Sequence, residues 1–157
     1  MSAEDGPKGQ RRGRKIAMSD AEVDEFLGVA WTCRVASNGS SGPHVMPLWF
    51  LWQDGKLWLH SLSRSQRWKD IERDPRIAVV VDLGERYDEL RGVELRGRAE
   101  VVGEVPRTGA EANAELDEVE RGYAAKYLGG HDFGYDGRHG WLRLTPERIY
   151  SWDFRKL

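Results

Sequence analysis

The first ordered element that the pattern predicts is a helix near the N-terminus. Val23, Phe26 and Leu27 would lie together on one face of such a helix. Residues 19–22 carry a serine followed three positions later by a glutamate, which is the pattern of a capping box. The helix is expected to end near Gly28.

Short strands follow, separated by turn residues. The predicted strands cover residues 32–36, 44–52, 56–60, 77–81, 93–102, 141–144 and 148–152. A glycine- and serine-rich turn at 37–42 and a hairpin turn at 53–55 connect the first three strands. The run 77–81 is almost purely apolar and predicts a strand buried on both faces. The last two strands are expected to form a hairpin around Pro146.

Two further helices and one bend complete the pattern. One helix is predicted over residues 65–73 and ends before Pro75, and another is predicted over residues 110–128. Gly97, inside a long strand, indicates a bulge or a barrel bend. Because no helices connect the strands at regular intervals, a doubly wound sheet is not expected. The predicted class is α+β, mainly β, built as an antiparallel split barrel.

Composition narrows the class of protein. The chain has 157 residues with 39% hydrophobic and 32% charged, which fits one globular domain. Seven tryptophans suit a protein interface or a planar ligand as well as a core. The lone cysteine, Cys33, lies in an apolar run and is expected to be a buried, inert thiol. No apolar stretch is long enough to cross a membrane and no signal-peptide pattern opens the chain, so a cytoplasmic location is expected.

Positive charge is concentrated at the N-terminus. The net charge is −2, which argues against a nucleic-acid partner. Residues 1–15 hold five lysines and arginines and are predicted to form a basic, flexible arm before a domain over residues 16–157. A second interpretation, an arm that reaches an anionic ligand, stays open.

One segment has the composition of a phosphate site. Residues 61–69 follow a strand and open a helix, where backbone N–H groups are free. They supply three serines together with Arg64, Arg67 and Lys69. Simple capping of the helix by Ser65, with solvated charges beyond it, is the alternative.

Other chemistry is sparse. Pro47 lies inside the second predicted strand and indicates an edge or a bulge, where a ligand ring could meet the backbone. The four histidines have no metal-ligand spacing, so no metal is predicted. No catalytic residue can be assigned. Tyr87 and Tyr150 are candidates for proton donation, although interface tyrosines would explain them equally well.

The order of several motifs resembles a known superfamily. The segments are residues 42–50, 54–59, 61–69, 73–77, 92–100 and 150–157. Together they resemble the flavin/deazaflavin split-barrel superfamily of pyridoxamine-5'-phosphate-oxidase-like proteins. The chain is most similar to its actinobacterial FDOR-B branch, which uses coenzyme F420. The resemblance covers roughly residues 16–157 and implies a homodimer with coenzyme at the subunit interface.

The resemblance also implies positions for a coenzyme. Met46, Pro47, Leu48 and Trp49 match the strand that lines the ring, and His60 matches a position beside the coenzyme. Ser61, Ser65, Gln66 and Arg67 match the phosphate-contacting stretch, and Gly92, next to Arg91, matches a position where pyridoxamine-phosphate oxidases carry glutamine. Arg67 is expected to be the main phosphate anchor, solvated in the absence of coenzyme, whereas Arg64 is expected to point outward.

Two departures from the family affect the expected function. Val45 and Phe50 stand where pyridoxamine-phosphate oxidases place Arg and Lys on the ring-lining strand. Apolar residues there suit an uncharged deazaflavin ring. The expected function is F420-dependent hydride transfer to a small conjugated acceptor. The alternatives are an FMN-binding pyridoxamine-5'-phosphate-oxidase-like protein and a coenzyme carrier without turnover.

Overall fold

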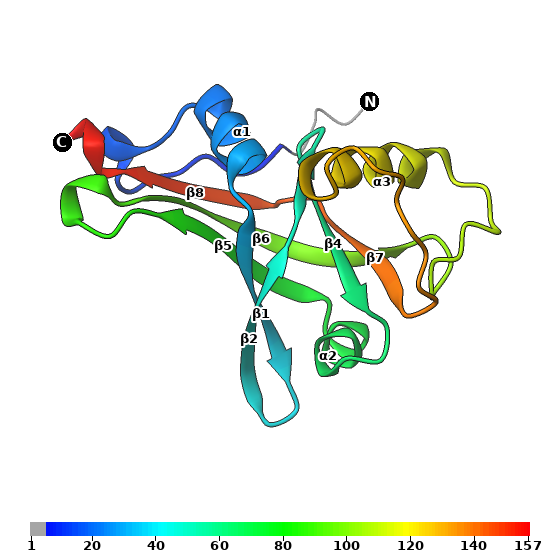
Figure 1. The fold of residues 1–157 in the computed structure, drawn as a ribbon. Coiled ribbons are helices and arrows are strands. Elements are labelled where there is room, and N and C mark those ends of the chain that lie inside the picture. The colour runs from blue at the N-terminus through cyan, green and yellow to red at the C-terminus, as the bar shows by residue number, and fades with distance from the viewer. Residues whose placement is uncertain (1–5) are drawn as a thin grey trace, which may run out of the picture.

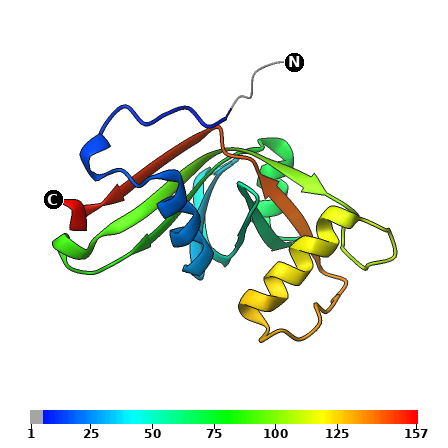
Figure 2. The same ribbon diagram turned by 90° about the horizontal axis from the view of Figure 1, so that it is seen from above.

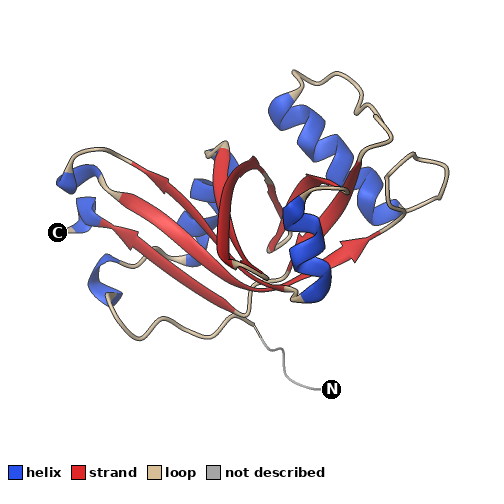
Figure 3. Ribbon diagram, turned by 90° about the horizontal axis from the view of Figure 1, so that it is seen from below, coloured by secondary structure: helices blue, strands red, loops and turns tan. Residues whose placement is uncertain are grey.

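An antiparallel sheet of eight strands forms the frame of the computed structural model, which describes residues 6–157. The strands are β1 (Thr32–Gly39), β2 (Gly42–Trp49), β3 (Leu51–Gln53), β4 (Lys56–Leu62), β5 (Arg76–Leu83), β6 (Arg91–Val102), β7 (His139–Leu144) and β8 (Arg148–Asp153). The helices are α1 (Asp20–Val29), α2 (Gln66–Arg73) and α3 (Ala114–Tyr127), with short 3-10 turns at Arg14–Ile16, Tyr87–Glu89 and Phe154–Lys156. The strand order is β2-β1-β5-β6-β7-β4-β3, and β8 pairs with β6 beside this path. The sheet curls into a half-barrel (Figures 1 and 3), which confirms the α+β class.

The long strand β6 joins the two halves of the sheet. One edge of β6 pairs with β5, and its other edge pairs first with β8 and then with β7. Gly97 lies where β6 changes partner, and a Cβ there would come within 2.8 Å of Leu144 Cδ1. The glycine therefore makes the room that the predicted bend needs.

The predicted hairpin around Pro146 is wrong. Both β7 and β8 are antiparallel to β6, so they run in the same direction and follow one another along its edge. Residues 145–147 carry the chain from one half of the sheet to the other. Local turn chemistry could not show this, because the direction of each strand is set by its distant partner β6.

Two apolar clusters lie on the two faces of β4, because neighbouring side chains of a strand alternate. Leu57 and Leu59 belong to the barrel core, which β1, β5, β6 and α1 complete. Trp58 belongs to a second cluster beneath α3, together with Trp141 and Tyr123. Figure 1 shows α3 lying across β4 and β7, whereas α2 follows the far end of β4, and Figure 2 shows the sheet from above.

The strand over 77–81 is buried on one face, not on both as predicted. Ile77, Val79 and Val81 are buried, whereas Ala78 and Val80 between them are only half-buried. Within residues 6–157 no element covers that outer face of β5. An apolar run by itself indicates burial without saying which layer supplies it.

Local signals placed α1 and α2 well, whereas α3 begins at Ala114 and not at the predicted residue 110. Ser19 caps α1 through both bonds of the capping box, and Ser65 caps α2. The predicted strand 44–52 is interrupted at Phe50, whose side chain enters the core while its amide donates to the Tyr127 hydroxyl (3.0 Å). Pro47 lies on the edge strand β2, as predicted.

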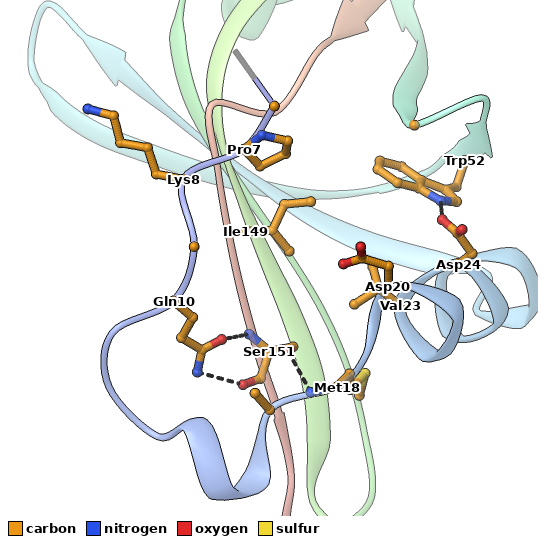
Figure 4. A pocket seen from close by; sticks show the side chains of 14 residues that line it. Pro7, Lys8, Gln10, Met18, Asp20, Val23, Asp24, Trp52, Ile149 and Ser151 are labelled. Carbon is orange, nitrogen blue, oxygen red and sulfur yellow. Dashed lines mark hydrogen bonds between the residues drawn. The ribbon is translucent and has the colours of Figure 1, made fainter. Parts of the chain in front are cut away.

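The described part of the basic arm, residues 6–15, lies along β8 (Figure 4). The Lys8 amide donates to Glu147 O (2.9 Å), and the Gln10 side-chain amide bonds both the N–H (2.9 Å) and the C=O (3.1 Å) of Ser151. The charge pattern predicted a flexible, solvated arm, but it carried no information about the open edge of β8 on which this segment docks. The first five residues of the predicted arm lie outside the described residues.

Candidate phosphate and coenzyme site

The corner between β4 and α2 is built by a serine cap. The Ser65 hydroxyl accepts from the Trp68 amide (3.1 Å) and donates to Leu62 O (2.8 Å), which turns the chain from strand to helix. The first amides of α2 have no partner within the helix. This is the local geometry that favours an anion.

Arg67 is buried beside this corner. The residue is only 8% exposed, and its Nη2 donates to the hydroxyl of Ser61 (3.0 Å), which is itself fully buried. Its Nε is enclosed without a hydrogen-bond partner, and Arg67 forms no ion pair with any carboxylate of residues 6–157. Burial lowers the pKa of this guanidinium.

The expectation that unliganded Arg67 is solvated is therefore wrong. Ile71 stands four residues later on the same face of α2 and is also buried, so the helix face that carries Arg67 packs inward. Arg64, by contrast, precedes the helix and is exposed, as predicted.

A cavity of about 470 Å³ opens next to the corner. It is lined by Leu62, Ser63, Arg64, Ser65, Pro106, Gly137 and Arg138. Ser63 fixes one wall, because its amide (2.9 Å) and its hydroxyl (3.0 Å) both donate to Arg138 O. The cavity thus combines serine hydroxyls with Arg64 and Arg138, and Arg67 is not among the residues that line it. Gln66, also predicted here, instead donates its side-chain amide to Asp70 Oδ1 (2.8 Å).

The predicted ring-lining residues lie on the edge strand β2. Met46 is 46% exposed and Trp49 is 43% exposed, whereas Leu48 is half-buried against the core. Pro47 and Trp49 occupy the face of β2 opposite to that of Met46 and Leu48. The Trp49 ring stacks on Tyr127, with centroids 4.5 Å apart and planes 4° apart.

His60 lies on the opposite face of β4 from Ser61. Its ring stacks on His139 with centroids 4.3 Å apart and contacts Phe133 and Trp141 beneath α3. Burial, assisted by the neighbouring His139, lowers the pKa of His60 to about 4. The structure therefore separates His60 from the corner that Ser61 and Arg67 form.

Arg91 and Gly92 are also distant from that corner within one chain. They begin β6, whereas Ser61 pairs with β7, which in turn pairs with the other end of β6. The path along β6 between the two places is roughly 35 Å long at about 3.3 Å per residue. Gly92 has a local role as well, because a Cβ there would come within 2.4 Å of the Trp152 ring.

The sequence pattern missed Lys126. Its Nζ lies 3.4 Å from Phe50 O and 4.1 Å from the centroid of the Phe50 ring. Burial lowers the pKa of this ammonium to about 8. A lysine in the last turn of a helix ordinarily faces solvent and complements the helix dipole, so nothing in the sequence distinguished it.

The remaining candidates from the sequence are the cysteine, a metal site and a membrane-spanning helix. Cys33 is fully buried, as predicted, and burial raises the pKa of its thiol to about 12. Across residues 6–157, no cluster of three His, Cys, Asp or Glu side chains could hold a metal ion. None of the helices described has the length and apolarity needed to span a membrane.

Comparison with known proteins assigns the chain to a family. The family model of pyridoxamine 5'-phosphate oxidase matches residues 19–153, so the chain belongs to this split-barrel family. The structure of the protein Rv2991 of Mycobacterium tuberculosis is 29% identical, with a TM-score of 0.79 over 94% of this chain and 92% of that chain.

More distant structures share the fold alone. An FAD-binding protein of Mesorhizobium loti is 19% identical, with a TM-score of 0.65 over 86% of this chain and 93% of its own. The FAD-binding protein of Mycobacterium smegmatis is 16% identical, with a TM-score of 0.65 over 86% of this chain and 94% of its own. No curated protein matches the chain.

Proposed function

We propose that the chain is an oxidoreductase that binds a phosphate-bearing flavin or deazaflavin coenzyme, with coenzyme F420 as the first candidate. The reaction is hydride transfer between the reduced coenzyme and a small conjugated acceptor. The observation that carries the proposal is Arg67, a buried guanidinium without an acidic partner among residues 6–157.

Burying a cation of this kind is unfavourable unless an anion pairs with it. Ser61 satisfies one N–H of Arg67, and the enclosed Nε has no partner in the described part of the chain. A phosphate at the start of α2 would accept from the guanidinium and from the free amides of the helix. Arg67 with the first turn of α2 would hold the phosphate, and the exposed Arg64 would add long-range attraction.

The bound coenzyme would supply the hydride chemistry, while the protein supplies orientation and an apolar environment. Among the two departures that favour a deazaflavin, Val45 is 60% exposed on β2 and available to a ring. Phe50 is buried in the core and gives no support to this choice. A flavin is the alternative, and the FAD-binding neighbours favour it.

A coenzyme carrier without turnover is the second candidate function. No side chain at the corner is placed to act as a necessary acid or base. Tyr87 is largely exposed and stacks against Phe154, and Tyr150 is half-buried on β8. A carrier would bind the reduced coenzyme tightly, yet that coenzyme would not be oxidised by any member of a panel of quinones, enones and bilins.

We also propose a twofold homodimer. Arg91 and Gly92 cannot reach the Arg67 corner of their own chain, so a site that includes both needs a second copy. The outer face of β1, β2 and β5 carries exposed Val45 and Trp49 next to half-buried Val80, which suits such an interface. Light scattering at micromolar concentration should give a dimer, and a monomer would remove the proposed cleft.

The test of coenzyme binding is a titration of the purified protein with F420, FMN and FAD. Arg67→Met should weaken binding by roughly 10–150-fold, the equivalent of a charged hydrogen bond of about 1.5–3 kcal/mol. Arg64→Met, the matched loss of an exposed charge, should weaken it less. Saturable binding of FMN or FAD without binding of F420 would identify the coenzyme as a flavin and not as F420. Equal affinity of the parent and Arg67→Met would place the phosphate elsewhere.

A further inference from the structure

A second, half-buried cation lies at the end of α3. Lys126 is half-buried, lies over the rings of Phe50 (4.1 Å) and Tyr127 (5.1 Å), and forms no ion pair with any carboxylate of residues 6–157. Its only polar contact in that part of the chain is a long hydrogen bond to Phe50 O (3.4 Å). The ammonium is thus partly desolvated, and its compensation comes from two aromatic rings and one long hydrogen bond instead of from a carboxylate.

Flat aromatic surface adjoins this ammonium. Trp31 and Trp49 are 52% and 43% exposed, and their rings meet edge to face with centroids 5.7 Å apart. Tyr127, the residue after Lys126, stacks on Trp49 and meets Trp31 edge to face. A cation beside an exposed aromatic wall suits a planar conjugated ligand that carries negative charge along one edge.

The two cations, which form no ion pair within residues 6–157, both act on the same core residue, Cys33. Cys33 pairs with Leu48 across β1 and β2, and Leu48 is one of the predicted ring-lining residues. The charges of Arg67 and of Lys126 both act on the Cys33 thiol, where each lowers its pKa against the larger effect of burial. Arg67 approaches from α2 and Lys126 from α3. Leu48 lies on the core face of β2 and Trp49 on the opposite face, so the ring site rests on Lys126, Tyr127 and Trp49 alone.

We propose that Lys126 binds the anionic edge of the reduced coenzyme ring beside Trp49 and thereby stabilises the reduced form over the oxidised form. This inference rests on the proposed function. A ring that has gained a hydride carries one more negative charge than its oxidised form until it takes up a proton. A fixed ammonium at its edge therefore favours the reduced state.

The experiment compares the parent, Lys126→Met and Lys126→Arg. The control is Arg121→Met, which removes one positive charge from the same helix at a side chain that is 72% exposed. Affinities for oxidised and reduced F420, FMN and FAD are measured anaerobically, together with the midpoint potential of whichever coenzyme binds. Thermal unfolding of the unliganded variants is recorded alongside.

Lys126→Met should weaken binding of the reduced form by about 10–100-fold and of the oxidised form by less than about threefold. The midpoint potential should fall accordingly by about 15–60 mV, since a tenfold change for two electrons is about 30 mV. Lys126→Arg should restore most of the difference, and Arg121→Met should show none. The unliganded Lys126→Met protein should be at least as stable as the parent, because a desolvated charge is lost.

Four outcomes would overturn the inference. Equal weakening of both redox forms by Lys126→Met, or no weakening, shows that Lys126 does not distinguish them. A large loss of unliganded stability shows that Lys126 is a structural anchor for Phe50 O. If Arg67→Met weakens coenzyme binding while Lys126→Met leaves the potential unchanged, the proposed function stands and this inference alone fails. If the parent binds none of the three coenzymes, both fall together.

Discussion

Arg67 should make the unliganded protein less stable than an apolar residue would. Replacing a buried, poorly compensated charge by a well-packed apolar side chain is commonly neutral or stabilising by about 1–4 kcal/mol. Arg67→Met alone would leave the Ser61 hydroxyl, which is fully buried, without its partner. That orphaned group costs about 1–3 kcal/mol. The informative protein is therefore the double variant Ser61→Ala/Arg67→Met, which removes both polar groups together.

The free energy of unfolding of the double variant should be roughly 1–3 kcal/mol higher than that of the parent. For a domain of this size, each kcal/mol corresponds to a shift of about 2–4 °C in Tm. The assay is urea unfolding in phosphate-free buffer at one fixed protein concentration, because dimerisation would make stability depend on concentration. Ser61→Ala alone serves as the control and should be destabilised, since the guanidinium then loses its one hydrogen-bond partner.

Inorganic phosphate adds a second readout in the same assay. At ten times its Kd, phosphate should stabilise the parent by about 1.4 kcal/mol and leave the double variant unchanged. A double variant that is less stable than the parent by more than about 1 kcal/mol would refute the reasoning, because Arg67 would then be structural.

Three further predictions concern other parts of the fold. Glu120→Leu should lower the unfolding free energy by about 3–5 kcal/mol, because the buried Arg107 would lose its bidentate partner. Urea unfolding measures this loss, and the double variant Glu120→Leu/Arg107→Met should recover a part of it. The folded state holds the pKa of His60 near 4 instead of 6.5, so the unfolded state binds more protons and stability should fall as the pH drops from 6.5 to 4, by at most ~3 kcal/mol. His60→Phe should remove this loss in urea titrations at stepped pH, and an unchanged slope would assign it to another group. Gly92→Ala should cost about 1–3 kcal/mol because its Cβ would meet an indole ring of β8, whereas Gly134→Ala, which has nothing within 4 Å, should be neutral in thermal unfolding.

Elements defined by neighbouring residues were predictable from the sequence. The capping box at Ser19 and the cap at Ser65 fixed the starts of α1 and α2. Asp54 and Gly55 both have positive φ, 52° and 72°, as the predicted hairpin turn requires. In each case the signal and the structure it determines lie within a few residues of each other.

Features that depend on distant partners were not predictable. The common direction of β7 and β8 follows from β6, some fifty residues away, and the docking of residues 6–15 follows from the open edge of β8. The candidate site likewise contains residues that the sequence predicted and features that it did not predict. The serines and Arg67 were found by composition, but the burial of Arg67 and the position of Lys126 depend on which elements pack around them.

The central claim is that this barrel holds a flavin or deazaflavin coenzyme through Arg67. The most direct measurement is the absorbance spectrum of the protein and of Arg67→Met, both purified from a host that makes F420, FMN and FAD. The account predicts that the parent retains a deazaflavin or flavin chromophore close to one per chain and that Arg67→Met loses most of it. A parent without any bound chromophore, which also fails to bind the three coenzymes when they are added, would contradict the claim.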